Sequence, residues 1–93
     1  MYVSISIHSP HPDKEKLVID SMHRYGEIAK KQPGLVSVHT LKDENTGELI
    51  GMAIWSSKES FLAARPALMK VTEKDDFDAG EKAPIRGHRL TPV

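Results

Sequence analysis

The chain has 93 residues, 39% of them hydrophobic, which suits one domain over residues 1–93 whose core would be thin in a monomer. Its 13 basic side chains balance 13 acidic ones, so it lacks the cationic surplus that binds nucleic acid. The lack of cysteine excludes disulfides, thiolate nucleophiles and Cys-ligated metals. There is no membrane-length apolar run and no signal-peptide pattern. We therefore expect a cytoplasmic, oligomeric protein without a membrane partner.

The first predicted elements are a strand and a helix. Residues Tyr2–His8 alternate between aliphatic and polar side chains, which is typical of a strand with two different faces. From Pro12 to Lys31, apolar residues recur at helical spacing, and acidic and basic residues complement the two ends of the helix dipole. The pair Pro33-Gly34 ends this helix.

A hairpin and a second helix are predicted next. The hairpin joins strands Leu35–Leu41 and Leu49–Trp55, and Gly47 supplies the positive φ that its turn needs. Ser56 and Glu59 have the spacing of a capping box, in which each side chain accepts a hydrogen bond from the other residue's backbone N–H. This pattern predicts the start of the second helix.

The last third of the chain is less regular. Pro66 lacks a backbone N–H and clashes with the preceding turn, so we expect a kink, or a second short helix that begins there. Residues Thr72–Ala83 predict a surface loop whose acidic run, Glu73–Glu81, is solvated and whose Phe77 could plug a pocket mouth. Residues Pro84–Leu90 predict a final, weaker strand. Its basic residues, expected to be solvated, are Arg86, His88 and Arg89.

The element order predicts the fold class. The order βαββαβ indicates an α+β, ferredoxin-like antiparallel sheet with both helices on one face. A second copy packed on the open face would form a dimeric α+β barrel and compensate for the thin core. The alternation alone does not decide whether the aliphatic side of the first strand (Val3, Ile5 and Ile7) or its polar side faces the helices.

Two strand histidines are the candidate catalytic residues. His8 shares one side of the first strand with Ser6, a candidate substrate-binding residue, and His39 lies on the next strand. Imidazole exchanges protons near neutral pH, so these histidines could serve as general base and orienting partner for a phenolic hydroxyl. The alternative is that they are merely solvated at a strand end and a sheet edge.

Three further side chains are candidate substrate-binding residues. Trp55 offers a flat wall for stacking on an aromatic ligand, and Phe61 follows it in the second helix. Arg65 could pair with a carboxylate or phenolate. The alternatives are core or interface anchors for the two aromatic residues, and an arginine that lies along its helix. No histidine pair has helical metal-ligand spacing, although His8 and His11 could clamp a metal weakly, so we expect neither metal nor cofactor.

Two segments carry a resemblance to a known family. Gln-Pro-Gly-Leu-Val-Ser-Val-His after the first helix, and Met-Ala-Ile-Trp-Ser-Ser-Lys-Glu-Ser-Phe after the hairpin, resemble the antibiotic biosynthesis monooxygenase family of dimeric α+β barrels. The resemblance covers nearly the whole chain in element order and is sharp from Gln32 to Ala64. It implies a homodimer, and it is compatible with oxidation of a small aromatic by O₂ without a cofactor.

The chain departs from the active subgroups of that family. Haem-degrading relatives use an Asn on the first strand and a Trp and a His on the second helix, where this chain has Ser6, Ala64 and Lys74. Polyketide-oxidising relatives have an Asn four residues before the strand-end Trp and a Tyr six after it. Gly51 and Phe61 occupy those positions here. Haem degradation is therefore disfavoured.

Two functions remain open from the sequence. One is a cofactor-independent monooxygenase of a small electron-rich quinol or phenol, with His39 or His8 as base and Trp55 and Phe61 as a hydrophobic wall that excludes water. The other is a non-catalytic dimeric barrel that binds small molecules or takes part in a stress response. A haem-handling protein is a third, less favoured function.

Overall fold

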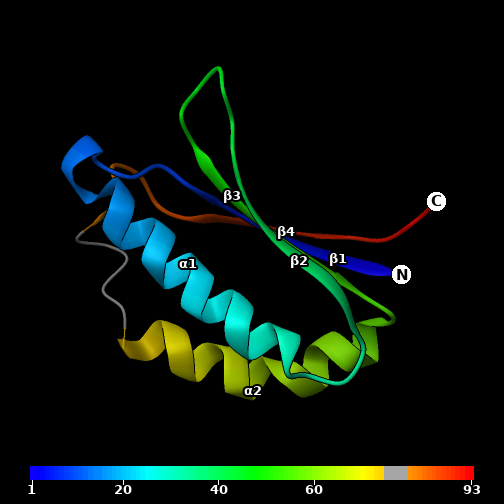
Figure 1. Cartoon of the computed structure of the whole chain (residues 1–93). Coiled ribbons are helices and arrows are strands. Elements are labelled where there is room, and N and C mark those ends of the chain that lie inside the picture. The colour runs from blue at the N-terminus through cyan, green and yellow to red at the C-terminus, as the bar shows by residue number, and fades with distance from the viewer. Residues whose placement is uncertain (75–79) are drawn as a thin grey trace.

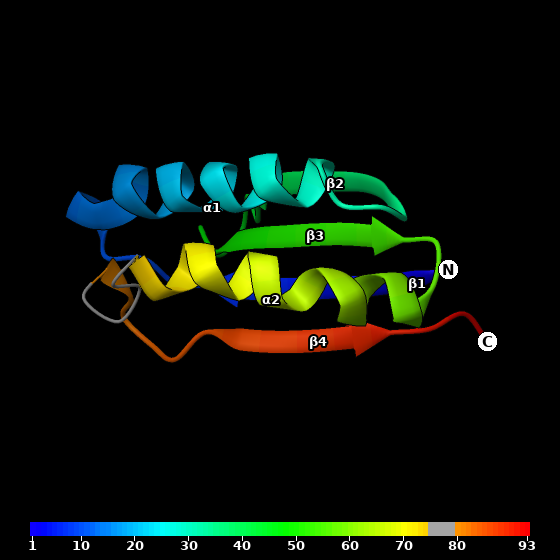
Figure 2. The ribbon, with the colours of Figure 1, turned by 90° about the horizontal axis from the view of Figure 1, so that it is seen from below.

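A four-stranded antiparallel sheet carries two helices on one face (Figure 1). This computed structural model describes residues 1–74 and 80–93, without the side chains of residues 72–74. In the view of Figure 2 both helices lie in front of the sheet, which is the predicted ferredoxin-like α+β arrangement. Within the described residues, no helix has the length and apolar character needed to cross a membrane.

The strands lie in the order β2-β3-β1-β4, so β1 and β3 occupy the centre of the sheet. The strands are β1 (Tyr2–His8), β2 (Leu35–Lys42), β3 (Leu49–Trp55) and β4 (Arg86–Leu90). The helical segments are the 3-10 turn η1 (Pro12–Lys14), α1 (Glu15–Lys30) and α2 (Lys58–Lys74). Each predicted strand and the first helix is thus present, and each end lies within three residues of its predicted position.

The start of α2 differs from the prediction by one residue. Ser57, not Ser56, caps the helix, because its Oγ accepts a hydrogen bond at 3.1 Å from the backbone N–H of Ser60. Ser56 donates its own backbone N–H to the carbonyl of Gly34 at 2.8 Å. This contact ties Ser56 to the start of β2, so the helix begins later and the predicted capping box with Glu59 is wrong.

The second helix also passes through its proline. Pro66 lies inside α2, and the predicted second short helix does not form. Ala64 and Leu68, on either side of Pro66, are both 2% exposed. Their burial stabilises the helix across the missing hydrogen bond. The helix runs to Lys74, so the loop predicted from Thr72 begins too early, and Phe77 lies outside the described residues.

The strand register decides which side of the sheet faces the helices. His8 pairs with Leu49 and Ser6 with Gly51, and Leu49 is a core residue only 2% exposed. Because paired residues point to the same face, the polar side of β1 faces the helices. The aliphatic side lies on the face that no described element covers. The residues of the two central strands on that open face are Val3, Ile5, Ile7, Ile50, Met52 and Ile54.

The core between sheet and helices consists of two clusters. The larger one is aromatic at its centre and contains Tyr2, Ala29, Ala53, Trp55, Phe61, Ala64 and Leu68. The smaller one contains Val18, Met22 and Leu49. Met22 of one cluster and Ala53 and Phe61 of the other line the same cavity. The cavity therefore lies where the two clusters meet.

Candidate functional site

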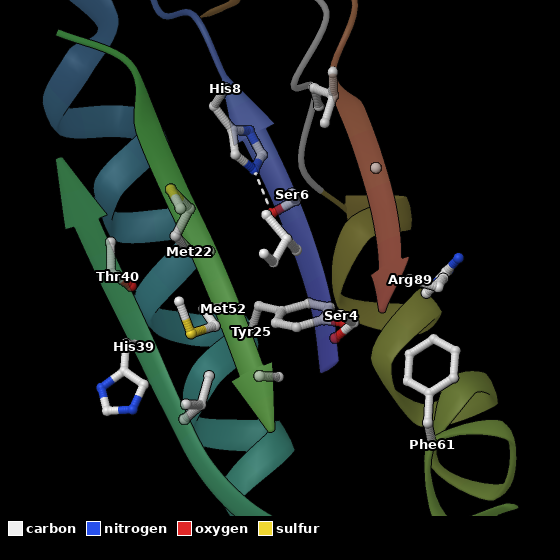
Figure 3. A pocket seen from close by; sticks show the side chains of 16 residues that line it. Ser4, Ser6, His8, Met22, Tyr25, His39, Thr40, Met52, Phe61 and Arg89 are labelled. Carbon is white, nitrogen blue, oxygen red and sulfur yellow. Dashed lines mark hydrogen bonds between the residues drawn. The ribbon is translucent and has the colours of Figure 1, made fainter. Parts of the chain in front are cut away.

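A cavity of about 290 Å³ lies between the sheet and the helices, with walls from all four strands and both helices. Its size is near the lower end of the range for small-molecule sites, roughly 300–1,000 Å³. Most of the wall is apolar, and Figure 3 shows the polar side chains projecting from different strands. The polar side chains that line it are Ser4, Ser6, His8, Tyr25, His39, Thr40 and Arg89.

His8 is held in one orientation by a buried carboxylate. Its Nδ1 lies 2.7 Å from Oε1 of Glu81, and the two side chains are 6% and 2% exposed. The other oxygen of Glu81 accepts the backbone N–H of Ser9 at 2.6 Å. An ionised carboxylate only accepts hydrogen bonds, so Nδ1 of His8 is the donor, and in the neutral imidazole Nε2 remains an acceptor.

Ser6 connects this pair to the cavity. Its hydroxyl lies 3.0 Å from Nε2 of His8, as the dashed line in Figure 3 marks, and Ser6 lines the cavity wall. Gly51 pairs with Ser6 across the sheet, and a Cβ at Gly51 would stand 2.8 Å from the Ser6 Oγ. Glycine at this position leaves room for the hydroxyl. Glu81, His8 and Ser6 thus form a hydrogen-bonded chain, which we call the relay.

The structure does not bring the two predicted histidines together. His39 pairs with Met52 on the open face of the sheet and its side chain is exposed. It borders the cavity, but Figure 3 shows its ring pointing away from His8. The prediction that His8 and His39 form a base and its orienting partner is therefore wrong in geometry. Glu81, predicted to be solvated, takes the orienting position.

Of the two aromatic residues predicted to form a wall of the site, Phe61 lines the cavity and Trp55 does not. Phe61 is 4% exposed and lines the cavity, whereas Trp55 is fully buried behind it, with ring centroids 5.8 Å apart and an edge-on angle of 70°. No group of the described chain accepts a hydrogen bond from the Trp55 Nε1–H. Trp55 is thus a core anchor that positions Phe61. Arg65 is exposed on α2 and does not line the cavity.

Arg89 is exposed, as expected for the solvated last strand, and it also lines the cavity. Its guanidinium carbon lies 4.7 Å from the centre of the Phe61 ring, a cation–π contact. Tyr25 of α1 lines the same cavity. Burial raises the pKa of the Tyr25 hydroxyl, and the positive charge of Arg89 acts in the opposite direction. Ser4 is the β1 partner of Arg89 in the sheet. These three residues form a second polar end of the cavity.

Two of these residues could not be found from local patterns. Glu81 ends a stretch of sequence that is rich in acidic residues and lacks helical or strand periodicity, and it lies 73 positions from His8 in the sequence. Arg89 lies on a short strand interrupted by Gly87, where alternation is too weak to assign a face. Within the described part of the chain, no group of three or more His, Cys, Asp or Glu side chains is placed to hold a metal ion.

Comparisons with known proteins identify the fold. No protein-family model matches the sequence, and no curated protein matches it. The structure is similar to Rv0793 from Mycobacterium tuberculosis, with a TM-score of 0.85 and 16% identity over 99% of this chain and 94% of that one. It is also similar to an antibiotic biosynthesis monooxygenase, with a TM-score of 0.79 and 11% identity over 100% and 99% of the two chains.

A third similar structure is SnoaB, a cofactor-independent oxygenase from Streptomyces nogalater. Its TM-score is 0.76 and its identity 15%, over 99% of this chain and 92% of that one. These similarities confirm at the level of the fold the resemblance carried by the Pro-Gly turn and the strand-end tryptophan.

Proposed function

We propose that the protein is a cofactor-independent monooxygenase that oxidises a small electron-rich quinol or phenol with O₂. The observation that carries the proposal is the relay of Glu81, His8 and Ser6, which ends at the wall of a mostly apolar cavity. The fold shared with SnoaB, itself named a cofactor-independent oxygenase, supports it. In this proposal His8 is the general base and Ser6 and Phe61 contact the substrate.

The first step is removal of a proton from the substrate hydroxyl. Ser6 Oγ takes this proton as it passes its own to Nε2 of His8, and the buried carboxylate of Glu81 stabilises the resulting imidazolium. The phenolate then donates an electron to O₂, and recombination forms a carbon–oxygen bond. The resulting peroxide takes up the proton held by His8. Loss of the hydrogen on the same ring carbon then breaks the O–O bond, so that one oxygen atom stays as a carbonyl and the other leaves as water. The apolar wall, with Phe61 in it, limits competing water chemistry.

The same order of carboxylate, imidazole and hydroxyl activates serine nucleophiles in hydrolases. Acyl transfer also needs N–H donors that stabilise an oxyanion. Ser6 lies on β1, which pairs with β3 on one side and β4 on the other, so the sheet engages the backbone N–H groups around it. This favours proton transfer over acyl transfer. We expect a fluorophosphonate probe to leave Ser6 unlabelled.

The proposal includes a homodimer. Six apolar side chains of the central strands lie partly exposed on the open sheet face, and contiguous apolar surface of this kind is typical of an interface. Packing of a second copy on this face would form the dimeric barrel. A dimer that binds a small aromatic without oxidising it is the second candidate function, because the cavity alone supports binding as well as turnover.

Oxygen uptake tests the proposal. Aerobic incubation with a panel of naphthoquinols and phenols should consume O₂ faster than autoxidation, and His8→Asn should slow uptake about 100-fold. His23→Asn, at an exposed histidine on α1, is the matched control and should leave the rate unchanged. Ser6→Ala gives a milder test that keeps the buried hydrogen bond between His8 and Glu81. Saturable ligand binding with no uptake across the panel would instead support the binding protein, and a Soret shift on haem titration would support haem handling.

A further inference from the structure

The cavity has a second polar end that the proposed reaction does not use. Arg89 pairs with Ser4 in the sheet, whereas Ser6 pairs with Gly87, two residue pairs closer to His8. Gly87 has no side chain to fill the space between these two levels. The cationic end around Arg89 and the end of the relay therefore face one continuous space in the cavity.

The two arginines of β4, Arg86 and Arg89, differ in the groups that they contact. Arg86 forms an ion pair with Glu48 at 2.8 Å. Among the described residues, no carboxylate lies within ion-pair distance of Arg89, and its contact is the face of Phe61. Stacking on a ring leaves the N–H edge of a guanidinium available to bind a carboxylate through two parallel hydrogen bonds.

The surroundings of Arg89 also favour an anion. Tyr25 and Ser4 place hydroxyl donors at the same end, and no described residue that lines the cavity is acidic. Because burial raises the pKa of Tyr25, its hydroxyl remains protonated and able to donate at neutral pH. An anionic group would thus meet one positive charge and two hydroxyl donors without a competing carboxylate.

The sheet register gives the length of a ligand that would reach both ends. Strands rise about 3.3 Å per residue, so the Ser4 level lies roughly 7 Å from the Ser6 level and roughly 13 Å from the His8 level. A single ring with neighbouring hydroxyl and carboxylate groups is too short to span this distance. Two fused rings with the groups at opposite ends have the required length.

We propose that the cavity selects hydroxyaromatic acids of two-ring size, with Arg89 binding the carboxylate while the hydroxyl lies against Ser6 and His8. The orientation of the hydroxyl rests on the proposed function. Binding of the carboxylate does not, because it requires no turnover. Arg89 is in this sense a specificity-determining residue for the substrate class.

Equilibrium binding of two matched probes tests this. The first is 6-hydroxy-2-naphthoic acid, and the second is its methyl ester, which keeps the rings and the hydroxyl but not the charge. The acid should bind the wild-type protein about 10- to 100-fold more tightly than the ester. Arg89→Met should abolish that preference, and Arg89→Lys should keep part of it. Arg86→Met, at a paired arginine on the same strand, should retain it fully.

Equal binding of acid and ester by the wild type would overturn the inference, and so would a preference that survives in Arg89→Met or disappears equally in Arg86→Met. Oxygen uptake with the same probes separates the two proposals. Arg89-dependent binding without uptake leaves the acid-binding site standing and contradicts the monooxygenase. Oxygen uptake with neutral quinols, together with equal binding of the acid and the ester, would support the monooxygenase and contradict the acid-binding site.

Discussion

The two sides of β1 differ in chemistry: beyond Tyr2 its polar residues face the helices and its aliphatic residues lie on the open face of the sheet. The face covered by the helices bears Ser6, His8 and the contact to Glu81, whereas the open face bears six apolar side chains. Buried polar groups are unfavourable unless they are hydrogen-bonded, and exposed apolar area is unfavourable unless it is covered. The proposed reaction therefore concerns the covered face, and the proposed homodimer concerns the open face.

The covered face itself divides into two parts. Towards the start of β1, Tyr2, Trp55 and Phe61 pack as an aromatic core that needs no partner outside the chain. Towards the end of β1, Ser6 and His8 border open space. The aromatic core at the start of β1 thus supports the cavity at its end. Substitutions on the covered face and on the open face should therefore change different properties, namely stability and self-association.

The largest expected effect is on the covered face, at Glu81. Glu81→Ala should lower the free energy of unfolding by about 3–5 kcal/mol, because it removes the buried carboxylate that accepts from His8 Nδ1 and from the Ser9 N–H. Glu44→Ala, at an exposed position, is the control and should change stability by less than about 0.5 kcal/mol. Chemical denaturation followed by circular dichroism measures both. Equal losses in the two variants would show that the relay contributes nothing to stability.

On the open face, Ile5→Lys should weaken self-association at least about 100-fold, or ~2.7 kcal/mol, because a charge would be buried in the proposed interface. Leu62 on α2 is 48% exposed and lies on a helix, so Leu62→Lys should leave association unchanged. Sedimentation velocity over a range of concentrations measures the dimer. A wild-type protein that stays monomeric at high concentration would contradict the partner proposed for this face.

At the centre of the covered face, Gly51→Ala should destabilise the fold by about 1–3 kcal/mol, because the new methyl group would stand 2.8 Å from Ser6 Oγ and 3.3 Å from Met22 Cε. Gly26→Ala is the matched control. There a Cβ would meet Val38 at 3.8 Å, and alanine should stabilise α1 by up to about 1 kcal/mol. Thermal melts of both variants show whether each substitution raises or lowers stability. If Gly51→Ala were as stable as Gly26→Ala, the space around the Ser6 hydroxyl would not depend on glycine at position 51.

The smallest expected effect is a pH dependence at Tyr25. Burial raises its pKa above the ordinary value of 10.0, so the folded state disfavours the phenolate. The stability that this provides is fully present below pH 10.0 and is lost as pH rises through the folded pKa. The difference in unfolding free energy between wild type and Tyr25→Phe should therefore stay constant up to that pH and change above it. A difference that varies near neutral pH would exclude Tyr25 as the cause.

Much of the fold was predictable because its signals are local. The alternation of Tyr2–His8, the helical spacing up to Lys30 and the hairpin with Gly47 at φ 77° all depend on neighbouring residues, and all are present. Ser6 and His8 were assigned to one strand side for the same reason. The predicted capping box is wrong, and of the two outcomes expected at Pro66 the break does not occur, because tertiary contacts compete with the local pattern. Ser56 bonds to Gly34 instead of capping α2, and buried neighbours of Pro66 keep that helix continuous.

The sequence by itself determined the elements, their order and the presence of one polar and one aliphatic side on β1. Only the tertiary structure decided that the polar side is covered, that Glu81 and not His39 orients His8, and that Arg89 and not Arg65 lines the cavity. The physical reason is the range of the interactions. Alternation and helical spacing are set over a few residues, whereas the carboxylate of Glu81 meets His8 across 73 positions of sequence, which packing alone brings together.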